Sequence, residues 1–287
     1  MSNYKIARNN GSVLTVNGSA LRIPAFFKRE YDGLGYWLHI PSNATSDTPL
    51  IVVLHSAYGK SDATDKPQDV ESLDWMVTLK YVNERGVERE HNDIPKYMYN
   101  DALGDIPAYI IMPQTSSATE GWASRAAVNR GLPDKIISLT NSIINKYGIK
   151  SDKVSLTGFS VGGTGAWELA ARSSIFRRIY TVAGGLNGLS DNIEAADEAT
   201  DRVAYVADRL KSYGTRVWSR CSEHDDSASG AYEFYQVSRA IVEAMNTPNA
   251  VYDPFAAELM YNHDATLVHA FLDDPAEVVS YLTFSEN

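Results

Sequence analysis

One five-residue motif constrains this chain more than any other feature of its sequence. Residues 158–162, GFSVG, fit the pattern G-x-S-x-G, directly after the apolar run 154–157 and directly before a segment with helical character. In this context a serine lies at the tip of a sharp turn above the sheet, and the flanking glycines let the backbone pass closely. The motif therefore predicts a strand–turn–helix unit with Ser160 at its tip.

Apolar runs and helical patterns alternate along most of the chain. Strands are expected at residues 36–40, 50–54, 108–112, 154–157, 179–182 and 215–221, and helices at 132–147, directly after 162, and at 204–212, 232–245 and 275–282. Such alternation predicts an α/β fold, with a mostly parallel central sheet and helices on both of its faces. Nothing marks a second independent unit, so we predict a single domain over residues 1–287.

Two regions depart from this alternation. Residues 1–40 are predicted to form short strands, with a turn at Asn17-Gly18. Residues 67–107 are predicted to be an insertion, with a helix within 69–82 followed by a charged stretch that carries several Tyr and Pro residues. Both a lid at the ligand edge of the sheet and a solvated surface excursion fit this insertion.

Charge and hydropathy exclude some classes of partner. The net charge is −10 and the basic residues are scattered, whereas nucleic-acid binding requires clustered Lys and Arg. No apolar run approaches the ~18 residues of a membrane-spanning helix, so we expect neither a nucleic-acid nor a membrane partner. The first residues lack the basic and apolar segments of a signal peptide, which predicts a cytoplasmic protein. A secreted protein without its signal, or one released by lysis, would look the same.

The cysteine and histidine content bears on metals and disulfides. Cys221 is the single cysteine, so it cannot form an intramolecular disulfide, and we expect it to be buried in a strand. The scattered histidines lack a His-x-x-x-His spacing or a similar pairing. Neither a metal nor another cofactor is expected.

A serine hydroxyl is a poor nucleophile at neutral pH. To act as one, Ser160 needs a base within hydrogen-bonding reach, and the base needs a carboxylate that orients it. For a serine on a strand–turn–helix unit, the acid and then the histidine follow later in the chain, each on a loop after a strand. The predicted strand 215–221 leads into three carboxylates, of which Asp225 is favoured, Asp226 is next and Glu223 is third.

Two histidines near the end of the sequence are candidates for the base. His263 follows an apolar stretch and is expected on a loop before the final helix, where its side chain can reach the serine. His269 lies in the apolar context LVHAF, which favours packing, and is the alternative. His224 precedes the favoured acid and is expected to be a loop residue.

An oxyanion hole requires backbone N–H donors near the nucleophile. The N–H of Val161 is expected at a helix N-terminus, where free donors and the helix dipole favour negative charge. A second donor is expected from the loop after an earlier strand, and residues 55–59, HSAYG, occupy that place. Ala57 is the favoured donor and Ser56 the alternative, while His55 is expected to orient the loop.

With these pieces placed, the chain resembles the α/β-hydrolase esterases that are grouped with polyhydroxybutyrate depolymerases, feruloyl esterases and predicted esterase-like peptidases. The matching residues span 36–282 and include 36–41, 49–55, Gly59, Asp62, Pro113-Gln114, Trp122, 158–167, Phe176, 183–185, Val217-Trp218, Asp225, His263 and Asp274-Pro275. The family usually shows His-Gly where this chain has His55-Ser56, so Ser56 is expected in a conformation that glycine adopts easily. It also often shows His-Gly before its acid, where Cys221-Ser222 stand here. The resemblance implies an α/β-hydrolase fold, a Ser-His-Asp triad and ester hydrolysis.

These observations predict a serine hydrolase that cleaves a carboxylic ester through an acyl-enzyme, with Ser160, Asp225 and His263 as its triad. The leading hypothesis for the substrate is a carbohydrate-linked acetyl or feruloyl ester, on a small molecule or a polysaccharide, contacted by Tyr58 and Trp122. A peptidase or thioesterase with the same triad is one alternative. A degenerate hydrolase fold that serves as a binding or structural module is another. The sequence does not predict the oligomeric state.

Overall fold

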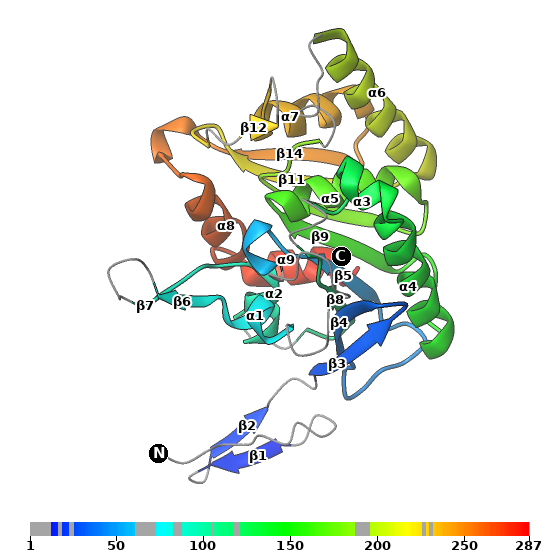
Figure 1. Ribbon diagram of the computed structural model, residues 1–287, viewed down its shortest axis with the longest axis vertical. Helices are drawn as coiled ribbons and strands as arrows, with labels where there is room; N and C mark the ends of the chain where they lie inside the picture. The colour runs from blue at the N-terminus through cyan, green and yellow to red at the C-terminus, as the bar shows by residue number, and fades with distance from the viewer. Residues whose placement is uncertain are drawn as a thin grey trace.

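The computed structural model describes residues 13–16, 19–22, 26–60, 73–82, 88–100, 102–104, 106–116, 121–186, 196–225, 228–229 and 232–286. Within these residues an eight-stranded sheet runs through the molecule in the order β14-β11-β10-β9-β5-β8-β4-β3 (Figure 1). Its strands are β3 (Phe26–Tyr31), β4 (Leu34–His39), β5 (Leu50–Leu54), β8 (Tyr109–Pro113), β9 (Val154–Phe159), β10 (Arg178–Val182), β11 (Arg216–Ser222) and β14 (Ala250–Phe255). The pairings of β3 with β4 and of β4 with β8 are antiparallel, and the others are parallel.

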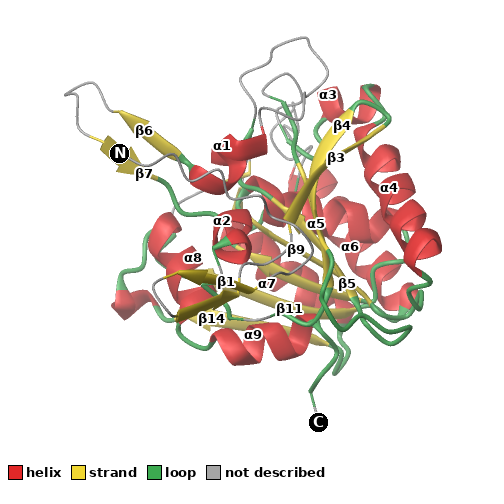
Figure 2. Cartoon of the chain, turned by 90° about the horizontal axis from the view of Figure 1, so that it is seen from below, coloured by secondary structure: helices red, strands yellow, loops and turns green. Residues whose placement is uncertain are grey.

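Helices cover both faces of this sheet, as predicted. One face carries α3 (Arg125–Asn129), α4 (Leu132–Tyr147), α5 (Val161–Arg172), α6 (Ala196–Tyr213) and α7 (Phe234–Met245), and the other α1 (Leu73–Thr78), α2 (Ile94–Tyr99), α8 (His263–Leu272) and α9 (Pro275–Leu282). Figure 2 shows α4 and α6 on one side of the sheet and α9 on the other. None of the helices in the described part of the chain has the length and hydrophobicity needed to cross a bilayer.

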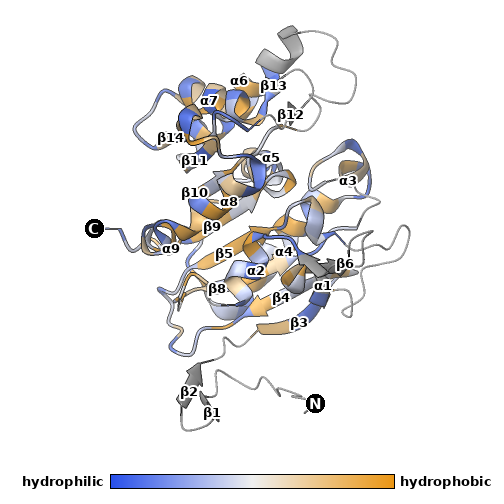
Figure 3. Ribbon diagram, turned by 90° about the vertical axis from the view of Figure 1, so that its left-hand side faces the viewer, coloured by the Kyte–Doolittle hydropathy of each residue, from blue (hydrophilic) through white to orange (hydrophobic). Residues whose placement is uncertain are grey.

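The central strand β5 shows why the sheet needs two layers of helices. Its five residues are all fully buried; Leu50, Val52 and Leu54 belong to one core cluster, and Ile51 and Val53 to the other. Because successive side chains of a strand point to opposite faces, a uniformly apolar strand must be covered on both sides. Figure 3 shows this hydrophobic character along β5.

The two ends of α4 follow the sequence signals closely. The helix α4 begins after Gly131, which has φ 68°, and ends at Gly148, which has φ 64° and closes the last turn by donating its N–H to Ile144 O. Both glycines adopt the left-handed conformation that other residues adopt at a cost. The predictions of a helix over 132–147, with Gly148 as its stop, are confirmed.

Several elements differ from the prediction. The helix expected within 69–82 covers only α1, because Leu79 turns into the left-handed region at φ 48°, and the chain continues as the antiparallel hairpin β6 (Lys80–Val82) and β7 (Glu88–Glu90). In the N-terminal region, β1 (Val13–Val16) pairs with β2 (Ser19–Arg22), and the predicted turn at Asn17-Gly18 lies outside the described residues. The helix expected over 232–245 is preceded by a short strand pair, β12 (Ala228–Ser229) and β13 (Tyr232–Glu233).

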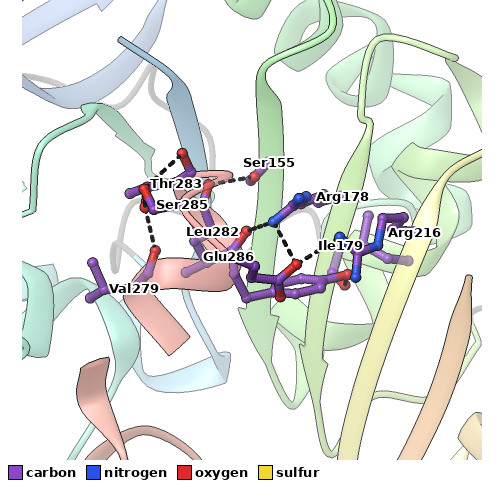
Figure 4. A network of polar contacts seen from close by, with 10 residues as sticks. Ser155, Arg178, Ile179, Arg216, Val279, Leu282, Thr283, Ser285 and Glu286 are labelled. Carbon is purple, nitrogen blue, oxygen red and sulfur yellow. Dashed lines mark hydrogen bonds and ion pairs between the residues drawn. The ribbon is translucent and has the colours of Figure 1, made fainter. Parts of the chain in front are cut away.

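A polar network fixes the C-terminal helix at the amino-terminal end of the parallel strands (Figure 4). Ser155 Oγ donates to Leu282 O at 2.7 Å, and Arg178 donates to Tyr281 O at 2.6 Å. Glu286 pairs with both Arg178 and Arg216, at 3.3 and 2.6 Å. The network lies at the edge of the sheet opposite the carboxyl ends of the strands, where the candidate functional residues gather.

Candidate active site

Ser160 occupies a sharp turn between β9 and α5, with φ 57° and ψ −120°. Its backbone N–H donates to Val182 O on the neighbouring strand at 3.0 Å. Glycines allow this turn, because a Cβ atom on Gly158 would lie 2.2 Å from Gly162 O, and one on Gly162 would lie 2.2 Å from Leu54 O. The predicted strand–turn–helix unit is confirmed, and Ser160 is held in a conformation that non-glycine residues adopt only under strain.

The first turn of α5 presents free backbone donors beside the loop 55–59. The N–H groups of Val161, Gly162 and Gly163 have no acceptor within the helix, because they belong to its first turn. A Cβ on Gly162 would also lie 2.8 Å from His55 O, which shows how closely α5 approaches this loop. The arrangement places the helix N-terminus, with its partial positive charge, next to the loop that was predicted to supply the second oxyanion donor.

His55 is fully buried and holds this loop. Its Nδ1 donates to Ser56 O at 2.6 Å, since a carbonyl oxygen can only accept, and its Nε2 accepts the N–H of Thr115 at 2.9 Å. Burial lowers the pKa of His55 from 6.5 to about 3. His55 is therefore a neutral imidazole with both ring nitrogens engaged, which fits the predicted role of orienting the loop.

Ser56 needs no glycine-like backbone, contrary to the expectation. Its φ of −72° and ψ of −174° are ordinary extended values. Its N–H donates to Asp93 Oδ2 at 2.8 Å, so the alternative oxyanion donor already has an acceptor. Of the two predicted donors in this loop, the N–H of Ala57 is the one that these contacts leave for a ligand.

The candidate acid and base meet at the carboxyl ends of β11 and β14. Asp225 follows β11 in a turn closed by its own N–H donating to Ser222 O at 3.1 Å. His263 is the first residue of α8, not a loop residue as expected, and Asn262 caps that helix. The Nδ1 of His263 lies 2.7 Å from Oδ2 of Asp225, whose side chain is fully buried.

Aromatic contacts connect this pair to the serine. The His263 ring lies 4.6 Å from the ring of Phe159, the residue directly before Ser160, and 5.7 Å from that of Phe234. Its side chain is 22% exposed, so the imidazole is partly accessible to solvent. The structure thus brings Ser160, His263 and Asp225 to one edge of the sheet.

The alternative acids and bases have other surroundings. His269 pairs with Asp273 at 3.0 Å and stacks on Tyr261, with ring centroids 3.8 Å apart. Glu223 forms an ion pair with Arg239. Asp226 lies outside the described residues.

The two predicted substrate contacts have different environments. Tyr58 is 37% exposed next to Ala57, and its ring stacks on His91 with centroids 3.6 Å apart and planes 7° from parallel. Trp122 has no exposed surface, and its Nε1 donates to His55 O at 2.9 Å. Tyr58 is therefore exposed beside the predicted donor Ala57, whereas Trp122 is buried and holds the loop 55–59 through its bond to His55.

Asp93 was not predicted to belong to this site. It lies in the region predicted to be an insertion, where it caps α2 and holds Ser56. Burial raises its pKa from 3.8 to about 7. An aspartate before Ile94-Pro95 signals a helix start in the sequence, but nothing there signals the bond to Ser56, since the partner is a backbone group.

Comparisons with known proteins support the architecture. No protein-family model matches the chain, and no curated protein matches its sequence. Solved structures do match: dipeptidyl peptidase 4 of Porphyromonas gingivalis (TM-score 0.57, 14% identity, 93% of this chain and 36% of that one), 2,6-dihydroxy-pseudo-oxynicotine hydrolase (0.55, 12%, 92% and 69%) and a ferulic acid esterase (0.52, 14%, 88% and 92%). The chain thus spans about a third of the length of the dipeptidyl peptidases it matches.

The structural similarity covers most of this chain. Because the sequence identities are low, it is evidence for the fold alone. The mostly parallel sheet, the helices on both faces and the turn at Ser160 agree with it. The chain has the α/β-hydrolase fold, as the resemblance of its motifs implied.

Proposed function

We propose that the protein is a serine hydrolase that cleaves a carboxylic ester, with Ser160, His263 and Asp225 as its triad. The observation that carries this proposal is the 2.7 Å contact between His263 Nδ1 and the buried Asp225, beside a serine held at φ 57° at the tip of its turn. Buried carboxylates that orient a histidine next to a strained serine suit nucleophilic catalysis.

In this mechanism His263 Nε2 takes the proton from Ser160 Oγ as the oxygen attacks the ester carbonyl. The N–H groups of Val161 and Ala57 stabilise the negative charge on the carbonyl oxygen. The C–O bond of the ester then breaks, and the protonated His263 gives its proton to the departing alcohol. Water, deprotonated by His263, then attacks the acyl carbon; the bond to Ser160 Oγ breaks, His263 returns the proton to Ser160, and the acid is released. Asp225 fixes the tautomer of His263 and stabilises its cation.

The proposed substrate is a carbohydrate-linked acyl ester, either acetyl or feruloyl. The exposed face of Tyr58, stacked on His91 beside the oxyanion donors, offers an aromatic surface against which a phenolic acyl group or a sugar ring can pack. The similarity to a ferulic acid esterase, which covers 88% of this chain and 92% of that one, supports the same choice.

A peptidase or thioesterase is the second candidate. The similarity to dipeptidyl peptidase 4 favours the peptidase, although the chain corresponds to 36% of that protein. The same triad attacks esters, thioesters and amides, so the leaving group decides between these activities.

The first experiment is labelling with a fluorophosphonate, read by intact mass, on the wild type and on Ser160→Ala. We expect one adduct on the wild type and none on the variant. A panel of p-nitrophenyl acetate, methyl ferulate, acetylated xylan, an acyl thioester and a dipeptide p-nitroanilide then separates the candidates. Folded wild type that takes no label and cleaves none of these would overturn the proposal and favour a binding or structural module.

A further inference from the structure

Asp93 is a buried carboxylate with two backbone donors from different parts of the chain. Its Oδ1 accepts the N–H of Ile94, which caps α2, and its Oδ2 accepts the N–H of Ser56, 37 residues earlier, both at 2.8 Å. Its side chain has no exposed surface. Each carboxylate oxygen therefore serves a different element, one the helix α2 and the other the loop 55–59.

Capping a helix does not require a buried carboxylate. Asp274 caps α9 through Oδ1, which accepts the N–H of Glu277 at 3.0 Å, three residues on, and its side chain is exposed. Burying a charge is unfavourable unless hydrogen bonds compensate for the lost water. The feature that distinguishes Asp93 from Asp274 is the second bond, to the residue directly before Ala57.

The bonds around Ser56 fix two successive peptide groups. The peptide between His55 and Ser56 is held at both ends, by Asp93 on its N–H and by Trp122 Nε1 on its carbonyl at 2.9 Å. The peptide between Ser56 and Ala57 is held by His55 Nδ1 on its carbonyl. In a trans peptide the N–H points opposite to the C=O, so the Ala57 N–H points away from the buried imidazole.

We propose that Asp93 is a positioning residue for the oxyanion hole: its carboxylate holds the Ser56 N–H, and through this contact keeps the Ala57 N–H directed at the carbonyl under attack. This inference rests on the proposed function of the site. The inference also gives a role to α2, which lies in the region predicted to be a lid or a surface excursion. Asp93 at the start of α2 anchors the loop 55–59.

Two substitutions separate the bond to Ser56 from the cap of α2. Asp93→Ser keeps a helix-capping oxygen but is too short to hold both donors. Asp93→Asn keeps the shape and replaces one acceptor oxygen with an NH₂ donor, so it can accept only one of the two N–H groups. Asp274→Ser, which makes the equivalent change at α9, is the matched control.

We expect both Asp93 variants to lower kcat and the rate of fluorophosphonate labelling by roughly 10- to 100-fold, because losing an oxyanion donor outright costs about 10²–10³ in kcat. KM should change less than about threefold, since the donor acts mainly in the transition state. Asp274→Ser should match the wild type in both constants. Wild-type kcat in a folded Asp93 variant, or a rise in KM alone, would overturn the proposal.

Amide hydrogen exchange of the wild type, the two variants and the control provides a readout that does not depend on activity. We expect faster exchange in the segment that contains Ser56 and Ala57 in Asp93→Ser, with the segments of β9 and α5 unchanged. Unchanged exchange at Ser56 and Ala57 in a folded variant refutes the anchor even if no substrate is found. If the wild type takes no label, but exchange at Ser56 and Ala57 is still faster in Asp93→Ser than in the wild type, only the proposed function is refuted.

Discussion

The Nδ1 atom of His263 lies 2.7 Å from Oδ2 of Asp225, although His263 begins the helix α8, after β14, and Asp225 lies in the turn after β11. A carboxylate oxygen accepts this bond, so Nδ1 carries the shared proton and Nε2 carries the lone pair of the imidazole. In the proposed mechanism this tautomer takes the proton from Ser160. The contact with Asp225 therefore sets the orientation and the tautomer of His263.

We predict that His263→Ala and Asp225→Asn lower kcat by about 10³–10⁴, because the first removes the base and the second favours the wrong tautomer. His269→Ala is the matched control on the same helix, since its partner is the exposed Asp273. It should keep kcat within a few fold. Initial rates with p-nitrophenyl acetate measure all three, and equal losses at positions 263 and 269 would contradict the assignment of the base.

Strain at Ser160 predicts an order of stability between two inactive variants. A non-glycine residue in a sparsely populated backbone region is unfavourable by about 1–3 kcal/mol, while glycine costs about 0.5–1 kcal/mol in unfolded-state entropy. Ser160→Gly should therefore unfold with a free energy about 1 kcal/mol larger than that of Ser160→Ala. Urea unfolding of the two proteins side by side measures this difference, and equal midpoints would argue against strain at φ 57°.

Close backbone contact predicts that Gly162 cannot be replaced. An added Cβ would lie 2.2 Å from Leu54 O, and both groups belong to the packed centre of the fold. Gly162→Ala should lose on the order of 4 kcal/mol or more, enough to prevent folding in many proteins. Gly131→Ala, at φ 68° with no atom within 4 Å of the added Cβ, should lose only about 1–2 kcal/mol. Soluble yield and thermal unfolding distinguish the two.

Local signals explain which parts of the fold the sequence could predict. The helices over 132–147 and 275–282 were predicted to the residue, because a glycine follows the first and Asp274-Pro275 begins the second. The strand over 50–54 was equally clear, since burial on both faces demands an uninterrupted apolar run. In each of these elements the information lies within the element itself.

The parts of the fold that could not be predicted lack a signal in their own residues. They depend on a strand's position at the edge of the sheet, on a local backbone conformation, or on a residue far away in the sequence. Strand β14 contains Pro254, which is tolerated because β14 is the edge strand of the sheet, and it was not recognised as a strand. Leu79 ends α1 through its own backbone conformation, with no proline or glycine to signal it. Asp93 accepts the backbone N–H of Ser56, 37 residues earlier in the chain. Because almost every residue carries the same backbone N–H group, the sequence does not identify this partner.

The raised pKa of Asp93 predicts a specific dependence of stability on pH. Burial raises this pKa from 3.8 to about 7, so the folded protein keeps a proton that the unfolded chain has released between these values. Stability from this group is complete below pH 3.8 and is lost as the pH rises to 7, by up to ~4 kcal/mol. Wild type should therefore lose stability relative to Asp93→Asn between pH 4 and pH 7. A difference between the two that stays constant over this range would contradict the shift.

His55 predicts the opposite dependence. Its pKa falls from 6.5 to about 3 on burial, so the folded protein resists protonation that the unfolded chain accepts. Stability from this group is complete above pH 6.5 and declines as the pH falls toward 3, by ~1.4 kcal/mol for each unit. The advantage of wild type over His55→Asn should shrink between pH 7 and pH 4, as measured by urea unfolding at each pH.

The order of the three residues along the chain has a consequence for protein synthesis. Translation produces the turn at Ser160 first, then Asp225, and finally His263 at the start of α8. Until α8 has left the ribosome and packed beside Phe159, the nascent chain has a serine without its base. The proposed activity therefore requires α8, and a growing chain acquires it only after this helix has been made and has packed.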